Sequence, residues 1–190
     1  MTLRSQKTPG RDSKSGKRAF VDTIRTMITF KSGDVKFTYR VGGIAIHNDS
    51  VLFQTATENT SGPFYFLPGG RAELSEQATE SLKREMLEEL GVDITIERLL
   101  YVIENFFIDP YPHHELGLYF LISFPPDSYL YKESGPFIRI DETTPELPLI
   151  FEWLPRSQFA QSLIQPECLR DALQTIPDQT THIVHTSQHR

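Results

Sequence analysis

The segment that most constrains this chain is GGRAELSEQATESLKREMLEELGV, residues 69–92. Leu82, Met86 and Leu90 recur within it at the spacing that places side chains on one face of an α-helix. Ser75 suits the N-cap of such a helix, and Gly91 suits the left-handed position just after its last turn. Six glutamates share the same short stretch: Glu73, Glu76, Glu80, Glu85, Glu88 and Glu89. The sequence thus predicts an amphipathic helix with a high density of negative charge.

Three of these carboxylates are expected on one side of the helix. Glu85, Glu88 and Glu89 are surface neighbours, because residues three and four apart face the same way. Like charges at this spacing oppose helix formation by about a few tenths of a kcal/mol per pair, and by more when partly buried. A compensating cation is therefore expected, either Lys83 and Arg84 or a hard divalent ion such as Mg²⁺ or Mn²⁺. For the three glutamates alone, a solvated acidic face is the alternative.

Strand patterns surround the predicted helix. Before it, MITF, VKFTYRVGGIAI, VLFQTA and FYFL are rich in β-branched and aromatic residues, and Asn48-Asp49-Ser50 supplies a turn between the second and third. After it, ITIERLLYVIENFF and LGLYFLISF predict long strands separated by the loop IDPYPHHE, while FIRI and LIFEWL predict shorter ones. PECLRDALQTI predicts a second helix. This order favours an α/β fold with a mixed sheet and helices packed on its faces.

Length and charge favour one domain with tails. A chain of 190 residues with 38% hydrophobic content can bury one substantial core, and no stretch approaches the ~20 apolar residues of a membrane span. Residues 1–25 carry seven basic side chains against two acids, whereas the whole chain has a net charge of −6. The acidic body disfavours nonspecific binding to nucleic acid. We expect the basic segment to be disordered, or else to be a transit peptide.

The single cysteine, Cys168, excludes an internal disulfide and fits a reducing compartment. We therefore expect a cytoplasmic location. An organelle is the alternative if the basic N-terminus is a transit peptide.

Residues 70–92 carry a more specific pattern. It reads Gly70, five residues, Glu76, seven residues, then Arg84-Glu85-Met86-Leu87-Glu88-Glu89-Leu90-Gly91-Val92. This agrees at every defining position with G-x5-E-x7-R-E-U-x-E-E-x-G-U, where U is bulky and aliphatic, so the sequence resembles the Nudix hydrolase family. The resemblance implies an α/β/α sandwich whose motif forms a loop–helix–loop metal site. It places the domain at residues 35–178, between a basic N-terminal tail at 1–34, which leads into the first strand, and a C-terminal tail at 179–190.

The resemblance also implies the site residues and the cofactor. Metal ligands are expected at Glu85, Glu88, Glu89 and the backbone carbonyl of Gly69, with Mg²⁺ or Mn²⁺ bound. Two adjacent glycines fit this role, because without Cβ atoms the chain can bend and bring a carbonyl close to an ion. Arg84 would orient a neighbouring carboxylate, and Glu76 would hold the loop to the helix.

The general base remains open between two residues. Relatives differ in using a motif glutamate or one on a separate loop, so Glu85 and Glu115 are both candidates, and Glu115 is expected in the site as a ligand or as the base. The expected catalytic set is therefore Arg84, Glu85, Glu89 and Glu115. His113 and His114 precede Glu115, but neighbours on an extended segment point to opposite faces, so both cannot easily join it at one ion.

By resemblance, the expected reaction is metal-dependent hydrolysis of the pyrophosphate linkage in a nucleoside diphosphate joined to another group X. The expected partner is a small nucleotide derivative, with no membrane and with a homodimer possible. One alternative is a Nudix-fold module that senses a nucleotide without cleaving it. Another is hydrolysis of a capped RNA end, and the basic N-terminus is the only feature that supports it.

Overall fold

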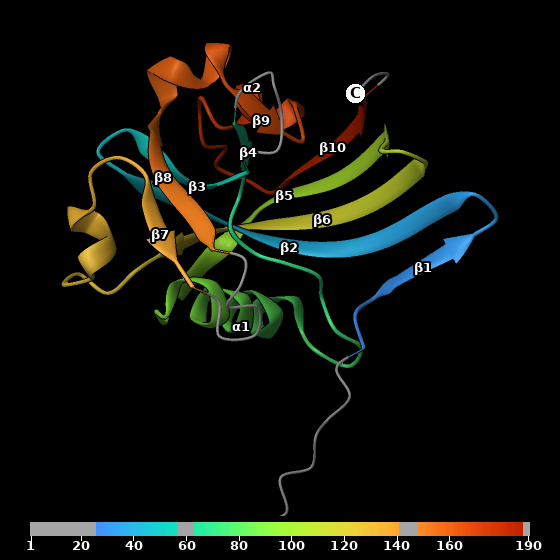
Figure 1. Ribbon diagram of the computed structural model, residues 1–190, viewed down its shortest axis with the longest axis horizontal. Coiled ribbons are helices and arrows are strands. Elements are labelled where there is room, and N and C mark those ends of the chain that lie inside the picture. Colours follow the sequence, from blue (N-terminus) through green and yellow to red (C-terminus); the bar gives the residue numbers. More distant parts are fainter. Residues whose placement is uncertain (1–25, 57–62, 141–147, 188–190) are drawn as a thin grey trace, which may run out of the picture.

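The computed structural model describes residues 26–56, 63–140 and 148–187 of the chain. Within them a large mixed sheet has helix α1 (Ala78–Leu90) on one face and the short helix α2 (Cys168–Ala172) on the other (Figure 1). The expected α/β fold is therefore confirmed. No helix of the described residues is long and apolar enough to cross a membrane.

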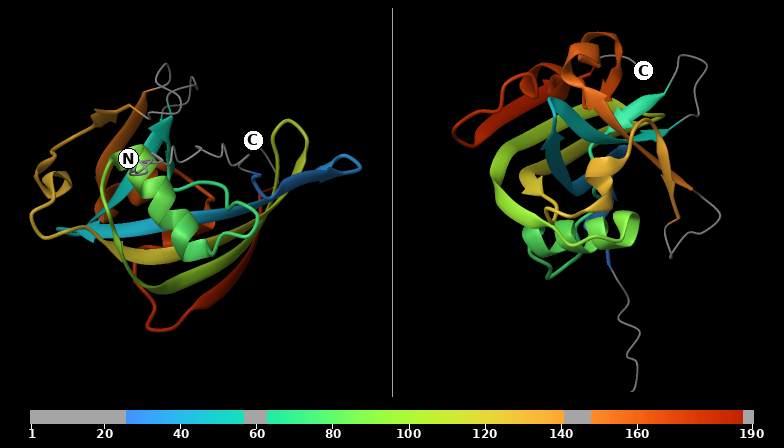
Figure 2. Two further views of the ribbon diagram at one scale, coloured as in Figure 1. Left: turned by 90° about the horizontal axis from the view of Figure 1, so that it is seen from below. Right: turned by 90° about the vertical axis from the view of Figure 1, so that its left-hand side faces the viewer.

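The strands in chain order are β1 (Thr29–Ser32), β2 (Val35–His47), β3 (Ser50–Ala56), β4 (Phe64–Phe66), β5 (Thr95–Ile108), β6 (Pro112–Ser123), β7 (Phe137–Arg139), β8 (Leu149–Pro155), β9 (Leu163–Gln165) and β10 (Thr181–Thr186). Strand β6 lies between β5 and β2, antiparallel to the first and parallel to the second. Strand β1 pairs with β2 in a hairpin that extends from the body (Figure 2). The sheet continues from the end of β2 through β3, β4 and β9, and β8 joins β3 to β7. Two short 3₁₀ helices, Tyr129–Lys132 and Arg156–Gln161, connect these elements.

The predicted turn between β2 and β3 is confirmed. Asn48 and Asp49 both have positive φ, at 47° and 62°, the left-handed geometry that a tight hairpin requires and that Asn and Asp tolerate well. The two strands therefore leave the turn as an antiparallel pair.

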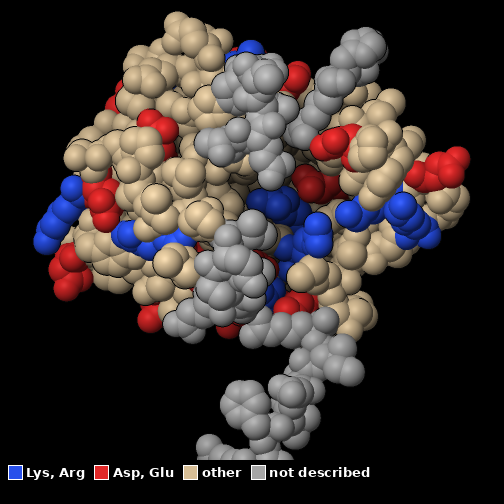
Figure 3. All heavy atoms as spheres, in the orientation of Figure 1, with Lys and Arg blue, Asp and Glu red and all other residues tan. Residues whose placement is uncertain are grey.

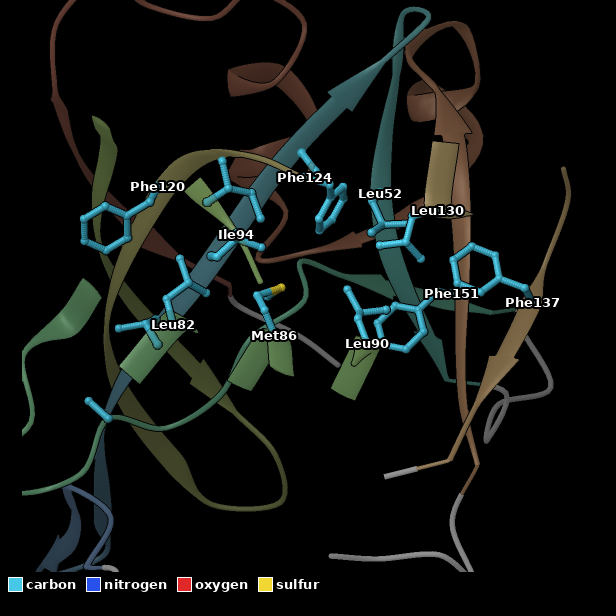
Figure 4. Close-up of a cluster of buried hydrophobic side chains, with 14 residues drawn as sticks. Leu52, Leu82, Met86, Leu90, Ile94, Phe120, Phe124, Leu130, Phe137 and Phe151 are labelled. Carbon is cyan, nitrogen blue, oxygen red and sulfur yellow. The ribbon is translucent and has the colours of Figure 1, made fainter. Parts of the chain in front are cut away.

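Helix α1 packs its predicted apolar stripe onto the sheet. Leu82 and Met86 are fully buried and Leu90 is 1% exposed, and all three belong to one hydrophobic core that also contains residues of β2 and β6 (Figure 4). Gly91 has φ 67°, and its N–H donates to the carbonyl of Leu87 at 3.0 Å, so the expected left-handed end of the helix is confirmed. The stripe fixes which side of α1 faces the sheet.

The start of α1 differs from the prediction. The helix begins at Ala78 after Gln77, whereas Ser75 lies outside it with φ 67° and does not cap it. Glu76 also precedes the helix, where its carboxylate folds back onto Arg84. This contact across the loop outweighs the local preference of serine for an N-cap.

Two other segments differ from the prediction because their residues pair as strands. The expected C-terminal tail contains β10, whose residues pair in parallel with β5 along Thr181–Thr186. The His-His-Glu part of the predicted loop IDPYPHHE belongs to β6, because pairing with β5 continues as far as Ile108 opposite Pro112. Only Asp109–Tyr111 turns between the two strands. The second helix is shorter than predicted and spans Cys168–Ala172.

Candidate functional site

The loop before α1 runs along the free edge of β2. Backbone hydrogen bonds join the amide of Gly43 to the carbonyl of Pro68 at 2.9 Å, and the amide of Val41 to the carbonyl of Gly70 at 2.9 Å. A Cβ atom on Gly69 would lie 2.3 Å from the carbonyl oxygen of Val41, and Gly69 has φ 132°. Only glycine permits this close approach. The loop is thereby held against the sheet at the two positions where the sequence has adjacent glycines.

The carboxylates of α1 lie along this loop. Glu89 is 9% exposed and accepts a hydrogen bond from the backbone N–H of Gly69 at 3.2 Å. The carboxylate of Glu85 lies directly over Gly70, where a Cβ atom would come within 2.3 Å of its carboxyl carbon. Glu88 is one turn below Glu85 on the same side. The structure therefore places Glu85 and Glu89 against the Gly69-Gly70 loop, and Arg84 joins Glu88 to Glu85.

Arg84 supplies positive charge among these acids. Its guanidinium donates to both oxygens of Glu76 at 3.0 and 3.1 Å, to Glu85 at 2.8 Å and to Glu88 at 3.2 Å. The paired bonds to Glu76 fix the loop to the helix, because a guanidinium and a carboxylate match in a bidentate geometry. The contact with Glu85 sets the direction of that side chain. The spacing of like charges is thus tolerated partly through an internal cation.

Burial changes how readily two of these acids ionise. Desolvation raises the pKa of Glu85 above its ordinary value, and the neighbouring Arg84 only partly opposes this. For Glu76, partial burial acts in the same direction, but the hydrogen bonds from Arg84 and Ser81 outweigh it and lower the pKa. Arg84 thus lowers the pKa of both glutamates, but burial outweighs it at Glu85 and not at Glu76.

The donor set suits a hard divalent cation. Three carboxylates and a backbone carbonyl are the oxygen ligands that Mg²⁺ and Mn²⁺ use. In the described part of the chain, however, no three His, Cys, Asp or Glu side chains already converge as a metal site. Glu85 turns to Arg84, Glu89 turns to the amide of Gly69, and the carbonyl of Gly69 accepts from Arg40 at 3.1 Å. In their chemistry, these residues therefore fit a hard divalent cation.

Glu115 lies on the opposite face of the sheet from α1. Its side chain lines a cavity of about 330 Å³, together with Arg40 and Tyr119. The other lining residues are Lys36, Thr38, Phe66, Leu67, Arg71, Asn105, Phe107, Asp109, His113, Gln165 and Pro166. Glu115 therefore does not join the three glutamates of α1 directly.

The cavity combines positive charge with aromatic walls. Lys36, Arg40 and Arg71 contribute cations, and blue side chains gather in the central hollow of Figure 3. The ring of Phe107 stacks on His113 with centroids 4.6 Å apart and planes 16° apart. Cations suit phosphate groups, and flat rings suit a nucleobase or another aromatic group. The lining is thus suited to a phosphorylated ligand with a planar part.

The two histidines before Glu115 separate as expected. His113 lines the cavity, whereas His114 lies on the other face, stacks on Phe106 at 4.4 Å between centroids, and approaches Glu104 at 3.9 Å. Alternation along β6 is the reason, because successive side chains of a strand point to opposite faces. No shared ion site forms between both histidines and Glu115.

Sequence reasoning missed Arg40 and Asn105. Arg40 follows Lys36 and Thr38 at alternate positions of β2, a polar face that the sequence displays but that does not reveal its partner. Asn105 interrupts the apolar strand β5, where asparagine is uncommon. Both signals were visible, yet only the tertiary structure brings the two residues into one cavity.

The fold and this arrangement define a Nudix protein. The NUDIX domain family model matches residues 36–168, and the chain belongs to this family. A stretch of 63 residues is 35% identical to an 8-oxo-dGTP diphosphatase of Proteus vulgaris, covering 33% of this chain. That match spans 56% of the relative, little more than half its length.

Solved structures agree on the fold. The mMutator MutT protein from Bacillus halodurans is 15% identical with a TM-score of 0.52, over 80% of this chain and 93% of that one. A NUDIX hydrolase from Nitrosomonas europaea is 16% identical with a TM-score of 0.50, over 79% of each chain. At these identities the likeness shows the shared fold.

Proposed function

We propose that this protein is a divalent-metal-dependent hydrolase that cleaves the pyrophosphate linkage of a nucleoside diphosphate derivative. One observation carries the proposal. The peptide of Gly69 joins the acidic helix to the cationic cavity, since its N–H donates to Glu89 and its carbonyl accepts from Arg40. A ligand whose planar part lies in the cavity would therefore extend its phosphates past Arg40 towards the carboxylates of α1.

Each group of residues has a distinct task in this proposal. Glu85, Glu88, Glu89 and the carbonyl of Gly69 would hold Mg²⁺ or Mn²⁺. The bound cation would neutralise charge on the phosphates and make a water molecule more acidic. Arg40 would contact the phosphates and release the Gly69 carbonyl to the ion. Arg84 would keep Glu85 directed at the loop, while Glu76 anchors the guanidinium from the other side.

Of the two candidates for the general base, the proposal assigns the role to Glu85. Desolvation raises its pKa above the ordinary value of a glutamate, which makes it the more basic of the carboxylates beside the Gly69-Gly70 loop whose pKa is shifted. Glu115 instead lines the cavity on the other face of the sheet. Glu115 remains the alternative base or ligand, and a Glu115→Gln variant that loses as much turnover as Glu85→Gln would favour it.

The substrate class follows from the cavity and from the relative. Lys36, Arg40 and Arg71 favour several phosphates, and the aromatic walls favour a nucleobase. The Proteus vulgaris relative is named for a purine nucleoside triphosphate, so purine di- and triphosphates belong first in a substrate panel. ADP-ribose, dinucleotides, nucleotide sugars and capped RNA complete it. The sensing module and the capped-RNA enzyme remain the competing functions, and the basic segment relevant to the latter lies outside the described residues.

The test is product release from this panel, with and without Mg²⁺ or Mn²⁺, for the full chain and for Glu89→Gln. We expect metal-dependent cleavage that falls by at least about 100-fold in Glu89→Gln. Glu80→Gln is the matched control, because Glu80 pairs with Lys83 on the exposed side of α1. Full activity in Glu89→Gln would overturn the metal site. Tight nucleotide binding without product would support the sensing module.

A further inference from the structure

Arg40 holds two carbonyl groups of the loop before α1. Its guanidinium donates to the carbonyl of Leu67 at 3.3 Å and to the carbonyl of Gly69 at 3.1 Å. The neighbouring carbonyls of Pro68 and Gly70 accept instead from backbone amides of β2. The Gly69 carbonyl is therefore held by a side chain, which can turn away, whereas the carbonyls beside it are fixed to the sheet.

The same guanidinium belongs to the cavity. Arg40 is half-buried and lines the cavity together with Lys36 and Arg71. Its charge also reaches α1: burial is the largest influence on the pKa of Glu85 and raises it, and the charge of Arg40 acts against burial. Arg40 thus lies between the cationic cavity and the carboxylates that are proposed to hold a metal.

A divalent cation and Arg40 would compete for the Gly69 carbonyl. Two positive groups at one oxygen repel each other, and the repulsion grows where water is partly excluded. A phosphate offers a guanidinium two anionic oxygens in a matching paired geometry, which is a stronger partner than a neutral carbonyl. A phosphate bound in the cavity would therefore draw Arg40 away from Gly69.

We propose that Arg40 is a gate on the metal site, which occupies the Gly69 carbonyl in the free protein and releases it when a phosphate group binds in the cavity. This inference rests on the proposed function for both the metal and the phosphate ligand. It requires that divalent cation and phosphate ligand bind cooperatively, and such coupling is reciprocal. Arg40 is then a positioning residue for a metal ligand as well as a contact for the phosphates.

The first test measures Mn²⁺ binding to the full chain without nucleotide, from the electron paramagnetic resonance signal of free Mn²⁺. Arg40→Leu removes the gate, so we expect it to bind Mn²⁺ at least about 10-fold more tightly than the natural chain, as loss of one competing charge-assisted hydrogen bond implies. Equal Mn²⁺ affinity in the two proteins overturns the proposal.

Arg71→Gln is the matched control. Arg71 also lines the cavity, but its side chain is exposed and donates to the sulfur of Met27. Its removal should change the Mn²⁺ affinity by less than about 2-fold, because an exposed charge is screened by solvent and salt. A gain as large as that of Arg40→Leu would show that any cavity cation has this effect and would overturn the gate.

Salt separates the gate from a simple effect of charge. Removing a cation near carboxylates favours Mn²⁺ through the electrostatic field, and this contribution weakens as the ionic strength rises. The ratio of the Mn²⁺ affinities of Arg40→Leu and the natural chain should nevertheless persist from about 0.05 M to about 0.5 M NaCl, because a direct contact is screened little. A ratio that falls to unity in high salt would overturn the proposal.

Opening by phosphate is tested with the α,β-methylene analogues of ADP and GDP, whose P–C–P bridge resists hydrolysis. Chelation in solution is subtracted with a titration that lacks protein. We expect at least one analogue to tighten Mn²⁺ binding about 5-fold or more in the natural chain and less than about 2-fold in Arg40→Leu. No gain in the natural chain, or an equal gain in both proteins, would overturn the gate.

A second variant covers the case in which Arg40→Leu does not fold. Arg40→Lys keeps the charge, but an ammonium lacks the fixed fork with which a guanidinium holds both carbonyls, so Mn²⁺ affinity should still rise at least about 3-fold. Unchanged affinity in a folded Arg40→Lys would overturn the proposal. Failure of the gate leaves metal-dependent product release in the natural chain intact, whereas failure of the proposed hydrolase is seen as absent product even where Arg40 controls Mn²⁺ binding.

Discussion

The carboxylate of Glu85 occupies the space that a Cβ atom at position 70 would need, since such an atom would lie 2.3 Å from the Glu85 carboxyl carbon. Gly70→Ala should therefore displace this carboxylate. The end of a flexible side chain moves easily, so we expect the free energy of unfolding to change by less than about 1 kcal/mol. Turnover should fall by about 100-fold, because small misplacements of a catalytic group are costly.

The neighbouring glycine is the control for this prediction. At Gly69 a Cβ atom would lie 2.3 Å from the backbone oxygen of Val41, and φ is 132°. Gly69→Ala should therefore lower the free energy of unfolding by at least about 2 kcal/mol. Chemical denaturation of both variants measures the difference. Equal losses of stability at the two positions would show that the Glu85 carboxylate is not what fills the space at Gly70.

Glu76→Gln should reduce stability in a pH-dependent way. The bidentate contact with Arg84 lies in a mostly buried setting, so we expect a loss of about 1–2 kcal/mol at pH 7. The folded pKa of Glu76 is lowered by its hydrogen bonds from Arg84 and Ser81, which outweigh partial burial. Its stabilising contribution is thus complete above the unfolded pKa of about 4.3 and disappears as the pH falls through the lower folded pKa.

Urea denaturation at pH 7, 5 and 3 measures this effect. The difference between the natural chain and Glu76→Gln should be constant from pH 7 to 5 and smaller at pH 3. Glu80→Gln removes an exposed i,i+3 pair with Lys83 and should cost less than about 0.5 kcal/mol at each pH. A Glu76→Gln effect as small as that of Glu80→Gln would contradict the anchoring role.

In the metal-free protein, Glu85→Gln should raise the free energy of unfolding, whereas Glu76→Gln lowers it. Burial raises the folded pKa of Glu85, so its ionised form opposes folding above that pKa. The variant should therefore be more stable than the natural chain at neutral pH, and this advantage should disappear as the pH falls through the unfolded pKa of about 4.3.

With a divalent cation added, the natural chain should become more stable than Glu85→Gln if the metal site is as proposed. Mg²⁺ or Mn²⁺ should raise the melting temperature of the natural chain, because a ligand that binds only the folded state stabilises it. The melting temperature of Glu85→Gln should rise much less. Thermal melts with and without EDTA decide the point, and an equal rise in both proteins would remove Glu85 from the ligand set.

Gly117→Ala should destabilise the floor of the cavity. A Cβ atom there would lie 2.5 Å from the ring of Tyr119, which is 2% exposed and has little room to move. We expect a loss of about 1–3 kcal/mol from overpacking. In a double-mutant cycle, Tyr119→Leu should relieve the clash and give a coupling of at least about 1 kcal/mol. Additive losses would show that the ring is not the obstacle.

Local chemistry in the sequence determined several features of this protein. The stripe of Leu82, Met86 and Leu90 identified α1 and its buried face, because helical periodicity depends only on spacing. Asn48-Asp49 and Gly91 marked a turn and a helix end through their tolerance of positive φ. The motif from Gly70 to Val92 identified the family.

Only the tertiary structure decided which distant residues meet. The start of α1 moved past Ser75 because Glu76 pairs with Arg84 across the loop. Residues expected in a tail formed β10 because β5 offered a free edge. Asn105 faces Glu115, and Arg40 reaches Gly69, through the register of strands far apart in the chain. Spacing along a sequence sets local shape, but register depends on the packing of the whole sheet, so the cavity could not be read from the sequence alone.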